Sequence, residues 1–394
     1  MVVVGGGPAG SMTAMLLARA GYEVTLLERQ HFPRAKPCGD CLSPGANPVL
    51  KRLGVWDDVV HARPARLTGW QLTSPGHISF QAYFSDITND SEVTAALAIS
   101  RDRLDSVLLD HARKAGVDVQ QGVHVTNVLR SPDGRVEGVI FQGVDRGNRV
   151  KARLTVGADG LRSVIARRLN AHVRRPRLRK ASFTMHIDLP TSSDNLGVMR
   201  IARDACLGIA QVDSHALTHN VTLVLNHGSY DARAGVRSIV AAGLKRFGLE
   251  LPDADTEILT SGPFDWPSRQ SVFDGAALVG DAAGYYDPFT GQGIFQALRS
   301  AELLGECASA ALRTGNVRRT DLLRFEHAQR RILKPARGLQ RIVEFVCARP
   351  QLADRIFGKF QRDPVLAEAL IGVTSDLLPV ARLLSPRLLA RLAA

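Results

Sequence analysis

The sequence predicts an α/β protein with an inserted β-rich part (α+β) and a helical C-terminal region. The chain opens with a strand, a glycine turn, a helix and a second strand, all within residues 1–28. Residues 181–260 have a β-rich pattern with one helix near 232–247. From residue 320 onward, helical periodicity dominates.

The first 28 residues have the pattern of a dinucleotide-binding βαβ unit. Gly5 allows a tight turn, Gly7 lets the backbone approach a pyrophosphate, and Gly10 lets the helix pack on the strand. The helix N-terminus offers free N–H groups to phosphates. Glu28 ends the second strand, where a carboxylate accepts from a ribose 2′-OH. The sequence therefore predicts a Rossmann-like domain that binds FAD or NAD, and not NADP.

The remaining elements are expected between these landmarks. A turn at Ser131-Pro132-Asp133-Gly134 predicts a hairpin. Strands are expected over 67–73, 77–84 and 97–100, three or four more within 117–156, and one over 276–279; helices are expected over 49–53, 101–114, 163–169 and 291–312. We expect a discontinuous nucleotide-binding domain (1–62, 96–172 and 266–315), a substrate-binding β-sheet domain (63–95 and 173–265) and a C-terminal helical region (316–394).

Composition excludes several classes of protein. The 394 residues are 45% hydrophobic and 22% charged, as in a globular protein. No uncharged apolar run approaches the roughly 20 residues of a spanning helix, and the start lacks the basic region of a signal peptide. We therefore expect a cytoplasmic location. Cys38 and Cys41 form a C-x-x-C without a second pair or a histidine cluster, so we expect no metal site, while a redox dithiol stays an alternative.

The net charge of +12 is mostly arginine, concentrated at 174–180 and in the C-terminal region. One interpretation is attraction to an anionic membrane surface, a carrier protein or a charged substrate. The other is solvated charge on helix faces. The basic runs have no interleaved aromatic residues, which argues against nucleic acid as a partner. The Leu- and Arg-rich end, 376–392, is a candidate for peripheral membrane contact, for a cover over an apolar pocket or for a plain helical cap.

Two further motifs follow predicted strands. Asp159-Gly160 and Gly280-Asp281 stand where ligands bind in α/β sheets, at the carboxyl ends of strands. Each aspartate is also of the type that caps a helix or closes a turn. Residues 288–293 then begin a long helix with two glycines, so the positive end of the helix dipole would stabilise negative charge on a reduced flavin. This last feature favours FAD over NAD.

This ordered set of motifs resembles the FAD-dependent oxidoreductases and monooxygenases of the p-hydroxybenzoate-hydroxylase-like superfamily. The resemblance covers residues 1 to about 315. It implies that FAD is held by the following residues: Gly5, Gly7, Pro8, Ala9, Gly10, Glu28, Arg29, Cys38, Gly39, Arg101, Asp159, Gly160, Gly280, Asp281, Pro288, Gly291, Gln292, Gly293 and Ile294.

Within this superfamily, residues 36–44 and 288–294 are most similar to the geranylgeranyl-reductase-like branch. The prenyl reductases carry an aromatic Tyr-x-Trp-x-Phe-Pro stretch, which the corresponding 208–213 lacks. Flavin halogenases share the fold, but their lysine has no counterpart here, because no Lys occurs between Lys51 and Lys114. Monooxygenases that act on polyketides and phenolic lipids are therefore the better analogy.

The resemblance implies an FAD monooxygenase that uses NAD(P)H as a transient electron donor and O2. It would hydroxylate a small apolar or aromatic substrate through a flavin C4a-(hydro)peroxide. Cys38, Asp40 and Asp287 are the candidate catalytic residues. The structural alternatives are that Cys38 is a buried thiol without a catalytic role and that each aspartate closes a turn. A flavin-dependent reductase of isoprenoid double bonds and a non-catalytic lipid-binding scaffold remain alternatives. Substrate identity and oligomeric state stay open.

Overall fold

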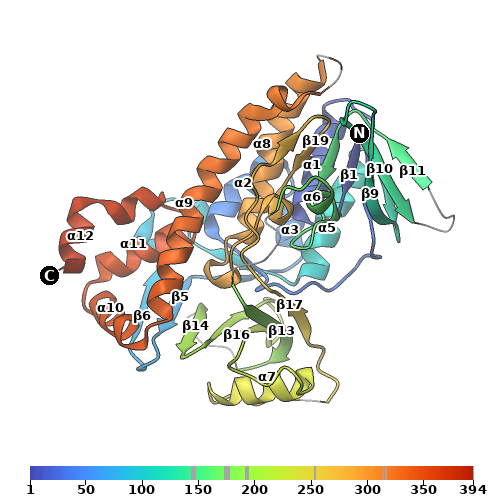
Figure 1. Ribbon diagram of the computed structural model, residues 1–394. Helices are drawn as coiled ribbons and strands as arrows, with labels where there is room; N and C mark the ends of the chain where they lie inside the picture. Colours follow the sequence, from blue (N-terminus) through green and yellow to red (C-terminus); the bar gives the residue numbers. More distant parts are fainter. Residues whose placement is uncertain are drawn as a thin grey trace.

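The computed structural model describes residues 1–142, 148–172, 178–190, 195–252, 254–313, 315 and 317–393. Residues 174–177 of the basic run 174–180 therefore lie outside the described residues. In the described part, the helices and strands form a six-stranded sheet, a seven-stranded sheet, two three-stranded sheets and a C-terminal group of helices (Figure 1).

The six-stranded sheet has the order β18-β19-β12-β1-β2-β8. Its members are β1 (Val2–Val4), β2 (Thr25–Glu28), β8 (Asp118–Gln121), β12 (Thr155–Gly157), β18 (Val272–Phe273) and β19 (Ala276–Leu278). All neighbours are parallel except β18, which is antiparallel to β19. β1 is fully apolar and buried, as a strand between two parallel neighbours must be. The carboxyl ends of β1, β12 and β19 therefore meet at one edge of the sheet, where ligands bind in such folds.

Helices cover one face of this sheet and a small sheet covers the other. The helices α1 (Pro8–Arg19), α5 (Arg101–Lys114) and α8 (Gly293–Arg313) pack side by side. The opposite face carries β9 (His124–Arg130), β10 (Val136–Gln142), β11 (Asn148–Lys151) and α6 (Val164–Arg168). Residues 117–156 thus contain β8 to β11 and most of β12, so the expected three or four strands are five. Three of them are short: β8 and β11 have four residues each and β12 has three.

The seven-stranded sheet has the order β17-β13-β16-β15-β14-β5-β6. Its members are β5 (Gly69–Thr73), β6 (Ser79–Tyr83), β13 (Lys180–Asp188), β14 (Leu196–Ala202), β15 (Ala205–Gln211), β16 (Thr218–Asn226) and β17 (Leu259–Ser261). One face is apolar and packs against α7 (Val236–Lys245). On the other face, β13 and β16 present polar pairs such as Thr184 opposite Thr222 and His186 opposite Asn220. We propose that the two large sheets mark the two domains expected from the sequence.

Short elements connect these parts. A three-stranded sheet joins β3 (Cys41–Leu42), β7 (Ala96–Ala98) and β4 (Ala65–Leu67), next to α2 (Asn47–Leu53), α3 (Trp56–His61) and α4 (Phe84–Ile87). The C-terminal helices are α9 (Leu323–Cys347), α10 (Pro350–Arg362), α11 (Pro364–Thr374) and α12 (Pro386–Ala393). α9 runs along α8 and reaches the seven-stranded sheet, where α10 and α11 lie against β6 (Figure 1). Among the described residues, no helix is long and apolar enough to cross a bilayer.

Candidate functional site

The three motifs that follow β1, β12 and β19 converge at one edge of the six-stranded sheet. Gly5 lies against the loop after β12, since a Cβ on Gly5 would come within 2.4 Å of the Ala158 carbonyl oxygen. Gly280 faces the start of α1, where its Cβ would lie 2.9 Å from the Cβ of Ala9. A Cβ on Gly10 would lie 1.8 Å from the Gly5 oxygen. Gly5 and Gly10 are therefore required by close approach of backbone, and Gly280 by close approach of Ala9. These contacts bring residues 158–160 and 280–281 beside the first turn.

Two guanidinium groups face the open side of Gly7. A Cβ on Gly7 would lie 3.6 Å from Nη2 of Arg34 and 3.8 Å from Nη2 of Arg101. Arg101, the first residue of α5, makes a bidentate pair with Asp105 (2.8 and 2.7 Å), and Arg34 lies 3.1 Å from the same carboxylate. Arg34 Nε is buried without a hydrogen-bond partner in the described part of the chain. Two cations that share one carboxylate leave an excess of positive charge, which fits an anion such as a pyrophosphate.

Glu28 lies where the sequence predicted it, at the end of β2. Its Oε2 accepts a hydrogen bond from the Gly6 N–H at 2.7 Å, and its Oε1 accepts from the Gln30 N–H at 2.9 Å. The side chain is buried, and each carboxylate oxygen can accept a second hydrogen bond, as a ribose hydroxyl would require. The neighbouring Arg29 is exposed, and its charge helps to lower the pKa of Arg34.

The two aspartates after β12 and β19 differ in their surroundings. Asp159 accepts hydrogen bonds from the Ser163 hydroxyl at 2.5 Å and from the Val164 N–H at 2.6 Å, so its carboxylate caps the start of α6. Asp281 is partly exposed, and its carboxylate lies 3.9 Å from Nζ of Lys36. Burial lowers the pKa of Lys36. Of the two, Asp281 is the one whose oxygens stay available to a ligand.

The segment 38–41 lies between the two large sheets. Asp40 is buried, with φ of +54°, and its Oδ2 accepts hydrogen bonds from His186 Nε2 at 2.6 Å and from Asn220 Nδ2 at 2.8 Å. Asn220 Nδ2 also donates to the Cys38 carbonyl oxygen at 2.8 Å. The hydrogen bond to Asp40 raises the pKa of His186, and burial raises the pKa of Asp40. These contacts attach the loop 38–41 to β13 and β16.

The thiols in this segment are not activated. Burial raises the pKa of Cys38 and raises the pKa of Cys41 to about 12. Arg101, which hydrogen-bonds the Cys38 side chain, opposes the rise only in part. Because a thiolate is the reactive form of cysteine, this environment argues against a redox dithiol.

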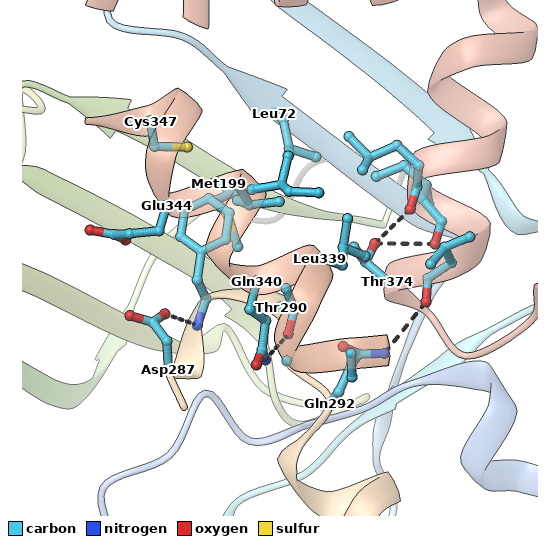
Figure 2. A pocket seen from close by; sticks show the side chains of 18 of the residues that line it. Leu72, Met199, Asp287, Thr290, Gln292, Leu339, Gln340, Glu344, Cys347 and Thr374 are labelled. Atoms are coloured by element: carbon cyan, nitrogen blue, oxygen red, sulfur yellow. Dashed lines mark hydrogen bonds between the residues drawn. The ribbon is translucent and has the colours of Figure 1, made fainter. Parts of the chain in front are cut away.

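A cavity of about 1110 Å³ begins at the loop 287–292 and extends between the seven-stranded sheet and the C-terminal helices. Side chains such as Leu72, Met199 and Leu339 form its walls (Figure 2). At one end, Asp287 is 5% exposed and lies 3.4 Å from Lys180, which also pairs with Glu344 of α9. The cavity thus combines a long apolar body with a small charged end.

Several residues of the site escaped prediction from sequence. Arg34, Lys36, His186, Asn220 and Asp376 were not singled out. Arg34 and Lys36 stand in the loop after Glu28, so two cations within a few residues of a pyrophosphate motif were the available signal. His186 and Asn220 come together only through the pairing of β13 with β16, and nothing in their local sequence indicates this contact.

Residues 1–335 match the family model described as FAD binding domain. The chain belongs to this family. The expected superfamily and the FAD cofactor are therefore confirmed. The excess positive charge at Gly7 and the place of Glu28 at the end of β2 fit the pyrophosphate and ribose of FAD in this flavoprotein.

Known relatives of the flavoprotein carry different names. It is 29% identical over 341 residues to menaquinone reductase of Mycolicibacterium smegmatis (78% of this chain, 75% of that protein). It is 28% identical over 351 residues to digeranylgeranylglycerophospholipid reductase 2 of Methanothermobacter thermautotrophicus (88% and 86%). It is 28% identical over 349 residues to conditioned medium factor receptor 1 of Dictyostelium discoideum, of which it spans only 66%.

Solved structures agree with the fold class. A flavoprotein/dehydrogenase from Cytophaga hutchinsonii has a TM-score of 0.79 with 21% identity, and covers 95% of this chain and 92% of its own. The flavin-dependent brominase Bmp2 has a TM-score of 0.78 with 18% identity (95% and 92%). PqsL of Pseudomonas aeruginosa, described as a probable FAD-dependent monooxygenase, has a TM-score of 0.72 with 17% identity (89% and 97%). At these identities the likeness shows the fold alone.

Proposed function

We propose that this flavoprotein is an NAD(P)H- and O2-dependent monooxygenase that hydroxylates an apolar or aromatic substrate of the polyketide or phenolic-lipid type. The observation that carries the proposal is the cavity of about 1110 Å³, whose apolar body begins at the loop 287–292. Its charged end, formed by Asp287, Lys180 and Glu344, suits one polar group such as a phenol.

The chain would contribute position, charge and exclusion of water. FAD, when bound, supplies the transfer of electrons and the activation of O2. Arg34 and Arg101 would hold its pyrophosphate, and Glu28 its ribose. The leucine-rich walls would keep water from the reacting atoms, which protects reactive species from side reactions. Cys38, Asp40 and Asp287 remain our candidates for contact with the reacting groups.

Two features of the sequence support hydroxylation over the other flavin reactions. The stretch corresponding to the aromatic motif of prenyl reductases lies in β15, where the small residues Gly208 and Ala210 line the cavity. The lysine associated with flavin halogenases has no counterpart between Lys51 and Lys114. Lys180 does line the cavity, but it is paired with two carboxylates.

A second candidate is a flavin-dependent reductase of isoprenoid double bonds. The relatives named as menaquinone and digeranylgeranylglycerophospholipid reductases favour it, because they align with most of this chain. The length and apolar lining of the cavity suit a prenyl chain as well as a phenolic lipid. A non-catalytic lipid-binding scaffold would leave the buried charges at Gly7 without a purpose.

Peripheral contact with a membrane is part of the proposal. Ile342 and Leu384, which line the cavity, and Phe345 beside them are exposed by 58%, 64% and 53%. Arg382 and Arg387 stand two and three residues from Leu384 in the sequence, whereas Arg391 pairs with Asp363. Exposed apolar side chains in a segment with arginines suit an anionic lipid surface, from which a lipid substrate would enter.

The decisive experiment separates the two reactions on the purified flavoprotein. The bound FAD is reduced anaerobically with NADH or NADPH, and O2 is then added with pentadecylphenol as substrate. A product that has gained one oxygen atom supports the monooxygenase. Anaerobic saturation of geranylgeranyl diphosphate, without any oxygenated product in the first assay, would replace it with the reductase. Failure to bind FAD at all would leave the scaffold.

A further inference from the structure

Residues on more than one side of α9 line the cavity. Gln340 and Glu344 face the loop 287–292 and the seven-stranded sheet, since Gln340 donates to the Thr290 hydroxyl at 2.7 Å and Glu344 pairs with Lys180. Figure 1 shows α9 between α11 and α12 on one side and β13 and β16 on the other. The sheet-facing side of α9 therefore bounds the charged end of the cavity.

A second stripe of α9 lines the cavity on the opposite side. It consists of Pro335, Gly338 and Ile342, which recur at the three- and four-residue spacing of one helix face. Gly338 and Ile342 stand two residues before Gln340 and Glu344, which is a rotation of about 200° around the helix axis. All three residues of this stripe are exposed. This outer stripe therefore faces away from the sheet and borders a second branch of the cavity.

The C-terminal segment supplies the other wall of this branch. The short helix η6 (Val380–Leu384) lies beside α9. Leu384 in η6 and Leu389 in α12 line the cavity, although they are 64% and 47% exposed. A side chain that lines a cavity and is also exposed stands at its mouth. The cavity thus opens to solvent through an apolar groove between the outer stripe and residues 384–389.

The outer stripe contains the two residue types that are least favourable inside a helix. Proline lacks the N–H group that the helix needs, and glycine loses the most backbone freedom on folding. Packing does not require the glycine, because a Cβ on Gly338 would meet no atom within 4 Å in the described part of the chain. A glycine instead lets a ligand approach the backbone closely. Gly338 therefore keeps the floor of the groove low enough for an elongated apolar molecule.

The two branches of the cavity differ in charge. At the charged end, Lys180 lies 3.4 Å from Asp287 and pairs with Glu344. The groove presents leucine, isoleucine, proline and glycine. An amphiphile is therefore most stable with its polar group at the charged end, where hydrogen bonds are available, and its alkyl chain in the groove. The other charged side chains that line the cavity are Asp204, Arg331 and Asp376.

We propose that the groove between the outer stripe and residues 384–389 holds the alkyl chain of the substrate, with its polar ring at Asp287 and the end of the alkyl chain directed to solvent. The inference rests on the proposed function, whose substrate is an aromatic or phenolic lipid, and adds the direction in which that lipid binds. The ring then lies at the loop 287–292, which we take as the loop against the flavin. Alkyl chains longer than the groove extend beyond the protein.

The first test locates the end of the alkyl chain by photo-crosslinking. The oxidised holoenzyme, without NAD(P)H, is irradiated with pentadecylphenol that carries a diazirine on the last carbon of its alkyl chain, and labelled peptides are identified by mass spectrometry. We expect the label within 335–346 and 380–392, and we expect excess pentadecylphenol to displace it. Label within 204–224 or 287–292 would place the end of the alkyl chain at the charged end and overturn the inference.

The second test fills the groove. Gly338→Phe places a ring where a Cβ meets nothing within 4 Å among the described residues. We expect the Kd of pentadecylphenol, measured by calorimetry, to weaken by about tenfold or more, since several methylene groups lose their site. The Kd of ethylphenol should stay unchanged, because this phenol occupies only the charged end.

Two variants control for the substitution itself. Gly338→Ala leaves the groove open and should keep the wild-type Kd for both phenols. Gly358→Phe is the matched control, because Gly358 stands within α10, only Arg362 of the described residues lies near its Cβ, at 3.9 Å, and it lines a separate, smaller pocket. It should also keep both Kd values.

A variant outside the core serves if Gly338→Phe does not fold. Leu384→Asp replaces a side chain that is 64% exposed, and it should weaken binding of pentadecylphenol but not of ethylphenol. Unchanged binding of pentadecylphenol to the folded groove variant overturns the inference and leaves the proposed function standing. If the wild-type holoenzyme binds neither phenol, the proposed function fails, and the inference fails with it.

Discussion

Arg101 and Asp105 stand one turn apart on α5 and form a bidentate ion pair with distances of 2.8 and 2.7 Å. Asp105 is fully buried and also balances Arg34. One carboxylate thus anchors both guanidinium groups that face Gly7. We expect stability and cofactor affinity to be coupled at this carboxylate, because a pyrophosphate bound at Gly7 would also balance the two guanidinium charges.

Replacing Asp105 by Asn should therefore destabilise the protein more when FAD is absent than when it is present. Without its carboxylate the site keeps two buried cations, and breaking a buried ion pair costs about 3–5 kcal/mol. Urea unfolding with and without FAD measures the difference. Asp110→Asn on the same helix, whose partner Arg113 is exposed, is the control and should change stability little. Equal losses in both conditions would refute the coupling.

Two glycines of the first turn should respond differently to alanine. A Cβ on Gly10 would lie 1.8 Å from the Gly5 oxygen, so Gly10→Ala should prevent correct packing of α1. A Cβ on Gly7 would meet only the guanidinium groups at 3.6 and 3.8 Å, so Gly7→Ala should fold and lose FAD affinity by tenfold or more, about 1.4 kcal/mol. Circular dichroism and FAD titration check both variants. A Gly7→Ala protein with wild-type affinity would place the pyrophosphate elsewhere.

The pair of His186 and Asp40 should make stability depend on pH. The hydrogen bond to Asp40 raises the pKa of His186 above its ordinary value of 6.5. When folding raises the pKa of a group, protonation of that group stabilises the folded state. The stabilisation is complete at pH values below the pKa in the unfolded state, and it is lost as the pH rises through the pKa in the folded state. The free energy of unfolding should therefore fall between pH ~6 and ~9, and His186→Gln should flatten this slope. His124→Gln, an exposed histidine on β9, should not.

A larger side chain on β15 should decrease the volume of the cavity. A Cβ on Gly208 has only the Thr222 carbonyl oxygen near it, at 4.0 Å, so Gly208→Leu should fold and fill part of the cavity. We expect binding of pentadecylphenol to weaken by tenfold or more, about 1.4 kcal/mol, while FAD affinity stays unchanged. Titrations followed by the flavin absorbance measure both the affinity for pentadecylphenol and the affinity for FAD. Undiminished binding would mean that the substrate does not occupy this part of the cavity.

The parts that the sequence predicted are those in which local chemistry dictates the structure. A Cβ on Gly5 or Gly10 would meet backbone oxygen at 2.4 or 1.8 Å, so these two positions require glycine. Together with Gly7 and the acid at 28, their spacing indicates the βαβ unit. Asp159 is a residue for which the local sequence allowed two roles. Its motif was recognised, yet its carboxylate is used by α6, which was the structural alternative for an aspartate in that position.

What could not be predicted depends on contacts between distant segments. His186 meets Asp40 across 146 residues, and Asp376 meets Ser43 across 333 residues. Neither contact leaves a periodic or local signal, because each is created by the packing of separate sheets and helices. The glycine turn and the acid at the end of β2 could therefore be predicted, whereas the contacts of the loop 38–41 and the walls of the cavity could not.

The family match ends at Pro335, inside α9, whereas the far wall of the cavity is built from helices that follow. An exchange of the segment after α9 between relatives would replace the far wall of the cavity and leave the glycine turn at residues 5–10 intact. Chimaeras joined within the exposed turn between α9 and α10, and not at residue 335, are the natural way to transfer substrate preference in this family.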